Sequence, residues 1–392
     1  MREVRIYHVQ LPMRVEFGHP AATRRVSDSV VLELDIEGEV GLGECAPRSY
    51  VTGETCGSVC EALRQLPFGR IIDRLLSESP QELFNCIRRQ GIEAVFDFTA
   101  ANNVVCIIEL AVLDWIGKRT KSSLGEMLGE RLCPADKGEP IKVSQVLDQS
   151  LTVEDFLRDR GPFHFVKVKA NRDRKKDIET VLALRRNIGM DIPIVMDANM
   201  AWGMTEAIAH MRDLRKAGVT MVEEPLARHS WDALRELRAQ TGMPVMLDET
   251  ISTLDELHYA VAKDSCDAVN VRVSKCGGIL RSMQIIEHTR KAGLQFQIGV
   301  QVAECGPLIQ AGRVLADLHR DAISVEGGQS DRFFDDMVVS PAPRFDREKN
   351  TVQPPLGLGF GLASTTNIAK YLAFRYSRTT NKWDSMPNDN EA

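Results

Sequence analysis

The sequence lacks an excess of charge of either sign. It carries 49 Lys and Arg residues against 55 Asp and Glu residues, which leaves a net charge of −6 at pH 7. Such a chain has no basic field that would attract a phosphate backbone or an anionic lipid surface. We therefore expect neither a nucleic acid nor a membrane as a partner.

Long apolar runs are also missing, and we expect no secretory leader. The N-terminal segment, MREVRIYHVQ, carries charges where a signal peptide needs an apolar segment. The most apolar stretch, 94–118, is interrupted by Asp97, Glu109 and Asp114, which indicates a buried helix and not a membrane span. The nine cysteines include no CxxC pair, and an odd number cannot all pair within one chain. These absences favour a reducing compartment, so we expect a cytoplasmic protein.

Several common catalytic motifs are absent as well. No GxSxG occurs, and the eight histidines include no HExxH and no closely spaced pair. The glycine-rich 357–361 follows no strand–helix pattern, which argues against a dinucleotide-binding loop. Cys305 has no histidine placed by the sequence to activate it, so we interpret it as a core thiol.

Two organisational patterns divide the chain. The segment 1–130 mixes short strands with helical patterns near 56–65, 80–91 and 101–117, typical of an α+β domain. From about position 140, short β-branched runs alternate with amphipathic helices, which predicts a parallel sheet. Eight such runs, the number that closes a barrel, lie at 142–147, 164–170, 192–198, 219–225, 244–249, 267–273, 294–300 and 321–327.

Carboxylates end three consecutive runs of this predicted barrel. Asp197, Glu223 and Asp248 follow one another at nearly equal intervals, each the length of one βα unit. We therefore expect the three side chains at one height on neighbouring strands, where active residues of such barrels lie. Three oxygen donors with open positions for substrate favour Mg²⁺. Any one of the three would serve equally well as a helix N-cap, but that reading explains the set less well.

Basic residues end the second and sixth runs. The alternation of a strand places Lys167 and Lys169 on one face, where mutual repulsion and burial should lower the pKa of at least one amine toward general-base use. A solvated Lys pair at a strand edge is the alternative. Asn270 and Arg272 share a face of the sixth run by the same alternation, and Lys275 lies beyond its end.

Taken together, the motifs identify a resemblance that covers nearly the whole chain. GLGECAP, YVTGET, KVKA, MDAN, VEEP, LDET, VNVRVSKCGG and GLGFG resemble the enolase superfamily, in particular its muconate-lactonising and dipeptide-epimerase subgroup within the mandelate racemase/muconate-lactonising enzyme family. The resemblance implies an α/β fold, a modified (β/α)₇β TIM-type barrel with an N-terminal α+β capping domain. The expected division is a cap at 1–130, the barrel at 131–345, and a segment at 346–392 that returns to the cap and ends in disorder.

The resemblance also implies a site. Mg²⁺, with Mn²⁺ as a substitute, would be held by Asp197, Glu223 and Asp248, while Lys169 acts as the base with Lys167 in support. Homo-oligomers are expected from the same resemblance. Further candidates around the metal or the substrate are Asn199, Glu249, Asn270, Lys275, Glu304, Glu326, His19 and Tyr50. The last two lie in capping segments at 15–25 and 49–54 that are expected to contact substrate, as is 326–332 after the eighth run.

One position departs from the family pattern. The family's second catalytic Lys would lie on the sixth strand, one βα unit after Asp248, at position 272, which is Arg in this chain. Lys275 occupies a neighbouring position and is expected to face elsewhere. A guanidinium stays protonated, so it can hold an anion but cannot exchange protons with carbon.

This departure shapes the predicted function. We expect abstraction of the α-proton of a small carboxylate by Lys169, a metal-stabilised enediolate, and then one-face cycloisomerisation or syn elimination. A first alternative is a dipeptide or N-acylamino-acid epimerase or racemase in which Arg272, Lys275 or water replaces the second base. A second is a non-catalytic relative that binds metal and carboxylate. A Schiff-base barrel using Lys169 is disfavoured by the three carboxylates.

Overall fold

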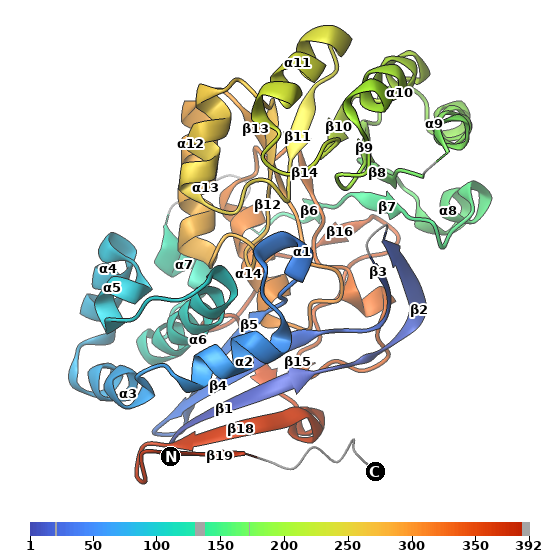
Figure 1. Cartoon of the computed structure of the whole chain (residues 1–392). Helices are drawn as coiled ribbons and strands as arrows, with labels where there is room; N and C mark the ends of the chain where they lie inside the picture. The colour runs from blue at the N-terminus through green and yellow to red at the C-terminus, as the bar shows by residue number, and fades with distance from the viewer. Residues whose placement is uncertain (20–21, 130–137, 172, 386–392) are drawn as a thin grey trace.

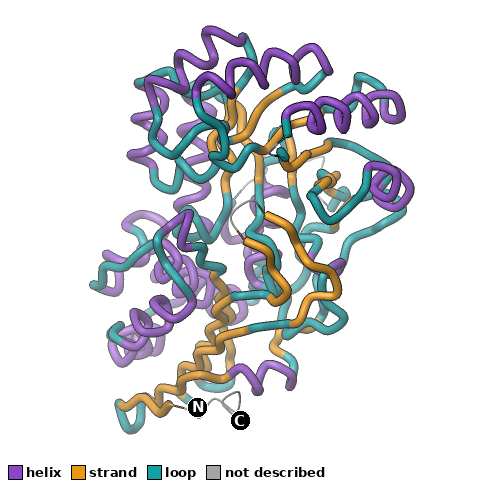
Figure 2. The backbone as a smooth tube through the Cα atoms, turned by 45° about the vertical axis from the view of Figure 1, so that its right-hand side comes forward, coloured by secondary structure: helices purple, strands orange, loops and turns teal. Residues whose placement is uncertain are grey.

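The computed structural model describes residues 1–19, 22–129, 138–171 and 173–385, and their arrangement is shown in Figure 1. An antiparallel sheet and its helices form the lower half of this view, and a parallel sheet surrounded by helices forms the upper half. Figure 2 shows the same two parts after a 45° turn. None of the helices in the described ranges is long and apolar enough to cross a membrane.

The antiparallel sheet joins the two ends of the chain. In spatial order it consists of β19 (Lys382–Ser385), β18 (Leu372–Ser377), β1 (Arg2–Val9), β4 (Ser29–Ile36) and β5 (Glu39–Cys45). The central strand β1 pairs with β18 on one side and with β4 on the other. The segment 346–392 therefore contributes strands to the N-terminal sheet. The boundary at 130/131 and the end at 386–392 lie outside the described residues, so the three-part division stays a prediction.

Seven helices accompany this sheet: α1 (Ser49–Thr52), α2 (Cys56–Arg64), α3 (Phe68–Ser77), α4 (Pro80–Gln90), α5 (Ile92–Phe96), α6 (Asn102–Thr120) and α7 (Leu124–Leu128). The predicted helix over 94–118 is two helices, because Asp97 adopts a left-handed conformation and ends α5. Buried α6 lies directly on β5, where a Cβ atom at Gly41 or Gly43 would clash with a backbone carbonyl of α6. The glycines of GLGECAP are thus required by helix–sheet packing.

The predicted barrel is confirmed. All eight expected runs form parallel strands in chain order, β7 (Gln145–Leu147), β8 (Val166–Lys169), β9 (Ile194–Asp197), β10 (Met221–Glu223), β11 (Val245–Leu247), β12 (Ala268–Val271), β13 (Gln295–Ile298) and β14 (Ser324–Val325). The first and last strands meet where the backbone N–H of Ser144 donates to the carbonyl of Val325 at 2.8 Å. This bond closes the sheet on itself.

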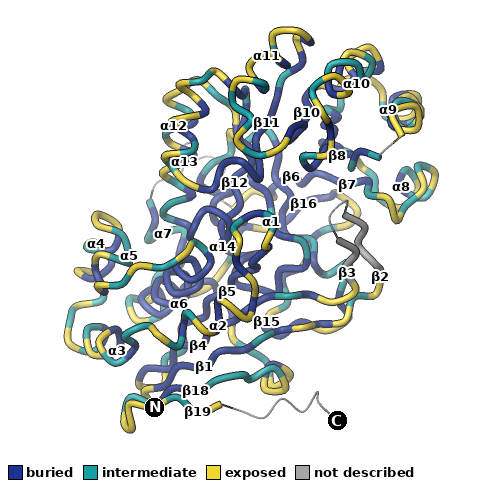
Figure 3. Tube along the Cα trace, viewed as in Figure 1, coloured by how far each residue is buried: buried dark blue, intermediate teal, exposed yellow. Residues whose placement is uncertain are grey.

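One helix follows each of the first seven strands, which gives the (β/α)₇β pattern: α8 (Val153–Arg160), α9 (Arg174–Ile188), α10 (Met204–Ala217), α11 (Trp231–Thr241), α12 (Leu254–Ala262), α13 (Ile279–Lys291) and α14 (Pro307–Leu318). Figure 3 shows buried strands inside the barrel and helices such as α9 and α12 with alternating buried and exposed turns. This is the burial expected of amphipathic helices that cover a parallel sheet.

Smaller elements connect the two halves. The hairpin of β2 (Pro12–His19) and β3 (Ala22–Val26) was not predicted from the sequence, and the backbone N–H of Arg14 donates to the carbonyl of Phe333 at 2.8 Å. That bond ties the hairpin to the loop after β14. Two short pairs complete the connections, β6 (Ile141–Lys142) with β16 (Thr351–Val352) and β15 (Val339–Ser340) with β17 (Ala363–Ser364).

Candidate active site

Three buried carboxylates lie at the ends of adjacent barrel strands. Asp197 ends β9, Glu223 ends β10, and Asp248 directly follows β11. All three residues are fully buried. Asp197 and Glu223 are register partners, whereas Glu223 pairs with Met246, two positions before Asp248. Asp248 therefore lies two positions further along its strand than the equal height that the spacing predicted, and this even offset keeps it on the same face.

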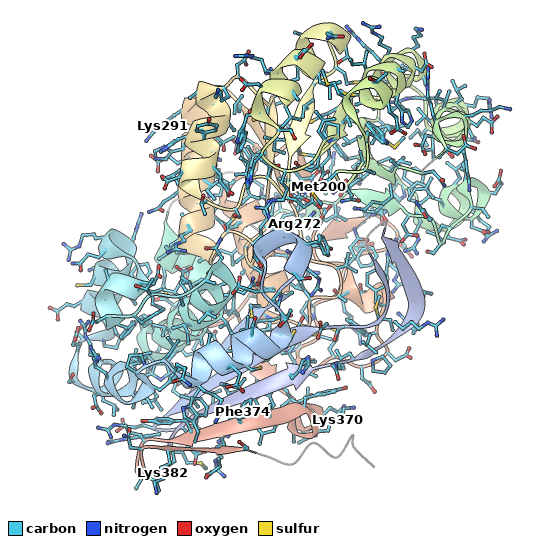
Figure 4. All side chains as sticks on the ribbon, viewed as in Figure 1. Met200, Arg272, Lys291, Lys370, Phe374 and Lys382 are labelled. Carbon is cyan, nitrogen blue, oxygen red and sulfur yellow. The ribbon has the colours of Figure 1, made fainter. Side chains whose placement is uncertain are left out.

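Each carboxylate contacts a basic side chain. Lys169 Nζ lies 2.7 Å from Asp197 Oδ2, and Lys167 Nζ lies 3.2 Å from the same oxygen and 2.9 Å from Glu223 Oε2. Arg272 forms an ion pair with Asp248 through Nη2. The structure thus brings the two predicted lysines, Arg272 and the three carboxylates into one network. Figure 4 labels Arg272 of this network.

The expected repulsion between the two lysines does not determine the pKa of Lys167. Burial acts to lower this pKa, but the carboxylates of Glu223, Glu326 and Asp197 outweigh burial and raise it well above its usual range. Conversely, burial acts to raise the pKa of Asp197, and the ammonium groups of Lys169 and Lys167 hold it well below its usual range. The surrounding carboxylates therefore favour the protonated form of Lys167.

The donor set fits a hard divalent cation in the type of its ligands and in its place at the strand ends, while its oxygen atoms do not all lie within 4.8 Å of one another. Carboxylate oxygens are the donors that Mg²⁺ prefers, and strand ends at the mouth of a barrel leave room for substrate. The three carboxylates are separated by amine and guanidinium groups: Lys167 contacts two of them, and Arg272 Nη2 lies 4.0 Å from Glu223 as well as beside Asp248. A bound cation would take over part of the charge neutralisation that these basic side chains give the three carboxylates.

A closer group of side chains that could bind a metal lies outside the barrel mouth. In the described part of the chain, only His8, Asp28 and Cys56 bring three such atoms within 4.8 Å of one another. His8 Nε2 lies 2.8 Å from Asp28 Oδ1, so this pair satisfies itself by a hydrogen bond. None of the three lines the cavity described below. We therefore prefer the strand-end carboxylates, because they lie beside the cavity and its lysines.

Asn199 and Glu249 form a layer next to the carboxylates. Asn199 Oδ1 accepts a hydrogen bond from Lys169 Nζ at 3.0 Å, and its Nδ2 donates to Glu249 Oε1 at 3.1 Å. Burial, with Glu224 nearby, raises the pKa of Glu249 to about 8. Asn199 thereby positions the Lys169 amine together with Asp197.

Glu224 is a structural residue that the sequence reasoning did not single out. Its Oε2 accepts from the backbone N–H of Asp248 at 2.7 Å and of Thr250 at 3.1 Å. Burial raises its pKa to about 7. Glu224, the second acid of VEEP, therefore fixes the backbone at Asp248. The sequence signal that could have identified Glu224 is the pair of adjacent acids at the end of a buried strand.

Lys275 does not line the cavity, in agreement with the expectation that it faces elsewhere, but it contacts Asp248, which was not expected. Its Nζ lies 2.9 Å from Asp248 Oδ1 and 2.7 Å from the carbonyl of Asn270, and the residue is fully buried. Strand β12 ends at Val271, so the alternation that predicted its direction does not extend to Lys275. Burial lowers its pKa to about 8. Asn270 Nδ2 donates to Glu223 Oε1 at 2.9 Å, so Asn270 positions the Glu223 carboxylate.

The remaining candidates divide between the cavity and its surroundings. Glu326 lines the cavity, with Oε1 3.0 Å from Lys167 Nζ and Oε2 accepting from the backbone N–H of Val300 at 2.7 Å. Tyr50 also lines it. Glu304 does not line the cavity, and its Oε1 accepts from the backbone N–H of Gln301 at 2.7 Å. The side chain of His19 lies outside the described residues.

The cavity itself occupies about 1120 Å³ with its open mouth included. Lys167, Lys169 and Arg272 line it, whereas the buried Lys275 does not. Val15 and Phe333, from the hairpin and the loop after β14, add apolar surface. A cavity lined by both basic and apolar side chains is suited to a small organic anion.

The comparisons with known proteins agree with this architecture. Residues 151–366 match the family model described as "Enolase C-terminal domain-like". The chain is 24% identical over 307 residues to the N-succinyl-L-Arg/Lys racemase of Bacillus cereus, covering 76% of this chain and 79% of the relative. It is 26% identical over 319 residues to the hydrophobic dipeptide epimerase of Enterococcus faecalis, covering 81% and 86%.

Solved structures show the same fold. The crystal structure of N-succinyl Arg/Lys racemase from Bacillus cereus superimposes with a TM-score of 0.82 at 21% identity, covering 95% of this chain and 98% of that chain. The dipeptide epimerase from Enterococcus faecalis, complexed with Mg and the dipeptide L-Leu-L-Tyr, superimposes with a TM-score of 0.78 at 22% identity, covering 92% and 99%. The chain belongs to the enolase superfamily, in the group of mandelate racemases and muconate-lactonising enzymes.

Proposed function

We propose that the protein is a Mg²⁺-dependent enzyme that removes the α-proton of a small carboxylate substrate with Lys169. The observation that carries this proposal is the position of Lys169, which lines the cavity while its Nζ lies beside Asp197 at the end of the neighbouring strand. A base and a carboxylate cluster at one barrel mouth are the combination needed to ionise a weak carbon acid.

Asp197, Glu223 and Asp248 would hold the cation. When bound, Mg²⁺ supplies positive charge beside the substrate carboxylate, where negative charge develops as the α-proton leaves. A relative of similar fold was crystallised with Mg and a dipeptide, which supports this choice of ion. We propose Mn²⁺ as a substitute because it accepts the same oxygen ligands.

The two lysines have different parts in this proposal. Lys167 remains protonated, because the surrounding carboxylates raise its pKa, and so attracts the substrate carboxylate. Lys169 must lose a proton before it can accept one from carbon. Its hydrogen bond to Asn199 Oδ1 and its contact with Asp197 hold the amine at the cavity wall.

Arg272 limits the outcome to one face of the substrate. It lines the cavity, pairs with Asp248 and donates from Nη1 to Gln301 Oε1 at 3.2 Å. A guanidinium stays protonated at neutral pH and therefore acts as a fixed positive charge. We therefore propose one-face cycloisomerisation or syn elimination as the outcome.

Epimerisation or racemisation of a dipeptide or N-acylamino acid is the second candidate. It is favoured by the racemase and epimerase activities of the relatives, and it requires a second proton donor on the face of Arg272. Lys275 is poorly placed for that role because it is buried and does not line the cavity. Accumulation of the opposite enantiomer would select this candidate.

The test is a screen of small carboxylic acids for α-proton exchange in D₂O with Mg²⁺. We expect at least one acid to exchange, with exchange stopped by chelation. A protein that binds Mg²⁺ and carboxylates without exchanging any of them would instead be a non-catalytic relative. Cytoplasmic location and a homo-oligomeric state remain predictions.

A further inference from the structure

We propose that the substrate carries a second anionic group, remote from the reacting carboxylate, and that Arg160 and Arg332 bind it. This inference rests on the proposed function, because it takes the cavity as the substrate site. It names the class of substrate: a dicarboxylate or an equivalent dianion.

The first step is an account of the cavity's charges. Six basic residues line it: Arg48, Arg160, Lys167, Lys169, Arg272 and Arg332. Lys167, Lys169 and Arg272 contact the strand-end carboxylates. Arg48 is buried and donates to the backbone carbonyls of residues 28, 47 and 302. None of these contacts involves the guanidinium groups of Arg160 and Arg332, the other two basic residues of the cavity lining.

The barrel topology places these two arginines together. Arg160 is the last residue of α8, which follows β7, and Arg332 ends the 3₁₀ helix Ser330–Arg332, which follows β14. Strands β7 and β14 meet where the barrel closes, so the two segments lie at the same seam. Buried Asn350 links them: its Nδ2 donates to the carbonyl of Arg160, and its Oδ1 lies 3.5 Å from Arg332 Nη2.

Neither guanidinium has a carboxylate within ion-pair distance in the described ranges. Arg160 makes no side-chain hydrogen bond or ion pair there, and Arg332 Nε is buried without a hydrogen-bond partner. The Arg332 guanidinium lies over the ring of Phe345 at 4.6 Å, which fixes its plane. Both residues therefore retain donors for a ligand.

Two acids, Asp148 and Asp331, act electrostatically on these arginines, but neither forms an ion pair with them in the described ranges. Asp148 lines the cavity near Arg160, but its Oδ1 accepts hydrogen bonds from the backbone N–H and the hydroxyl of Ser150. Asp331 does not line the cavity, and its Oδ2 lies 3.7 Å from Arg347 Nη2. Arg160 and Arg332 thus give the cavity lining positive charge that no lining carboxylate pairs with in the described ranges.

Electrostatics support the same conclusion. Burial, followed by repulsion from Arg160 and Arg347, lowers the pKa of Arg332 to about 9. Burial also lowers the pKa of Arg160. Both groups remain charged at pH 7 but are incompletely neutralised, so a bound anion is favoured and an ammonium group is repelled.

Paired probes that differ only in one charge test this inference. N-succinyl-L-alanine has a distal carboxylate, and N-succinamoyl-L-alanine has a carboxamide in its place. L-Ala-L-Glu and L-Ala-L-Gln form a second pair with the charge at another position. Binding would be measured by calorimetry with Mg²⁺ for the wild type, Arg160→Met, Arg332→Met and the double variant. Exposed Arg186 on α9 provides the matched control, Arg186→Met.

We expect the wild type to bind the acid of at least one pair roughly tenfold more tightly than its amide, as charge-assisted hydrogen bonds predict. The double variant should lose this preference and keep the amide affinity, whereas Arg186→Met should behave as the wild type. Equal affinities in both pairs, no detectable binding of either acid, or a preference that survives in the double variant would overturn the inference.

Proton exchange of the same probes separates the two proposals. Exchange in D₂O without acid preference would refute the anion site and leave the proposed function standing. Acid preference without exchange of these or any screened acid would refute the proposed function and leave the anion site standing. Thermal unfolding of each variant establishes that loss of preference does not come from loss of folding.

Discussion

Lys275 Nζ lies 2.9 Å from Asp248 Oδ1, and both side chains are completely buried. The same amine donates to the backbone carbonyls of Asp248 and Asn270. Lys275 therefore joins the ends of β11 and β12 and fixes a proposed metal ligand from outside the cavity. The Asp248 carboxylate is held between this lysine and Arg272.

Replacing Lys275 by Met should lower the free energy of unfolding by about 3 kcal/mol, because a buried charge pair is broken and Asp248 is left unpaired on one side. Urea unfolding at pH 7 measures this loss. Lys216→Met is the control, since the Lys216 side chain is 79% exposed and its ammonium group forms a surface ion pair with Asp213 at 3.3 Å. Equal small effects for both variants would show that Lys275 has no structural role at Asp248.

Asp197→Asn tests the proposed metal site. Mg²⁺ should stabilise the wild type by about 2.7 kcal/mol at roughly 100 times its Kd, because it binds the folded state only. The variant should lose most of this stabilisation, since one of three carboxylate ligands has become neutral. Melting temperatures with and without Mg²⁺ give the answer, and exposed Asp191→Asn is the control. A Mg²⁺-induced shift of wild-type size in Asp197→Asn would rule out this ligand.

Arg272→Lys tests the one-face outcome. With an exchanging substrate of known configuration in D₂O, the wild type should introduce deuterium with retention or release product by syn elimination, without forming the opposite enantiomer. The lysine variant gains a group that can lose a proton, so slow racemisation should appear. Chiral chromatography of the recovered substrate measures it. Rapid racemisation by the wild type would favour the epimerase candidate instead.

Much of the barrel was predictable because its signals are local. Each strand is a short β-branched run, each outer helix has an amphipathic period, and Asp197, Glu223 and Asp248 recur at the length of one βα unit. The orientation of Lys275 was not predictable by alternation, since β12 ends at Val271.

Long-range pairing explains what local patterns alone could not predict, although the resemblance implied that 346–392 returns to the cap. Strand β18 joins the N-terminal sheet by pairing with β1, which lies at the opposite end of the chain, and no local period encodes such a partner. Arg160 and Arg332 likewise come together only when β7 and β14 close the barrel. Their proximity depends on closure, whereas each residue alone resembles an ordinary surface arginine.

Glu109 on α6 should make stability depend on pH. Its Oε1 accepts from the backbone N–H of Leu280 at 3.1 Å, and burial raises its pKa from 4.5 to about 7. Because the folded state binds this proton more tightly than the unfolded state, the contribution of Glu109 to the free energy of unfolding is largest below pH 4.5 and falls until about pH 7.

Glu109→Gln removes this titration. Between pH 5 and pH 8 the stability of the wild type should fall by about 2 kcal/mol relative to the variant. Urea unfolding at the two pH values measures the difference. Any effect of the substitution on the free energy of unfolding that does not depend on pH cancels in this comparison. Exposed Glu179→Gln should show no such change. A stability difference between wild type and Glu109→Gln that is the same at both pH values would refute the assignment.

The central claim is that Lys169 takes the α-proton. Its most direct test is the rate of substrate α-proton exchange in D₂O, followed by ¹H NMR, for the wild type and Lys169→Ala with Mg²⁺ present. We predict a loss of about 10³-fold in Lys169→Ala, the size expected for removal of a general base, while Mg²⁺ still raises the melting temperature. Lys167→Ala should also raise KM, because Lys167 attracts the substrate carboxylate. Exchange by Lys169→Ala at the wild-type rate would contradict the account.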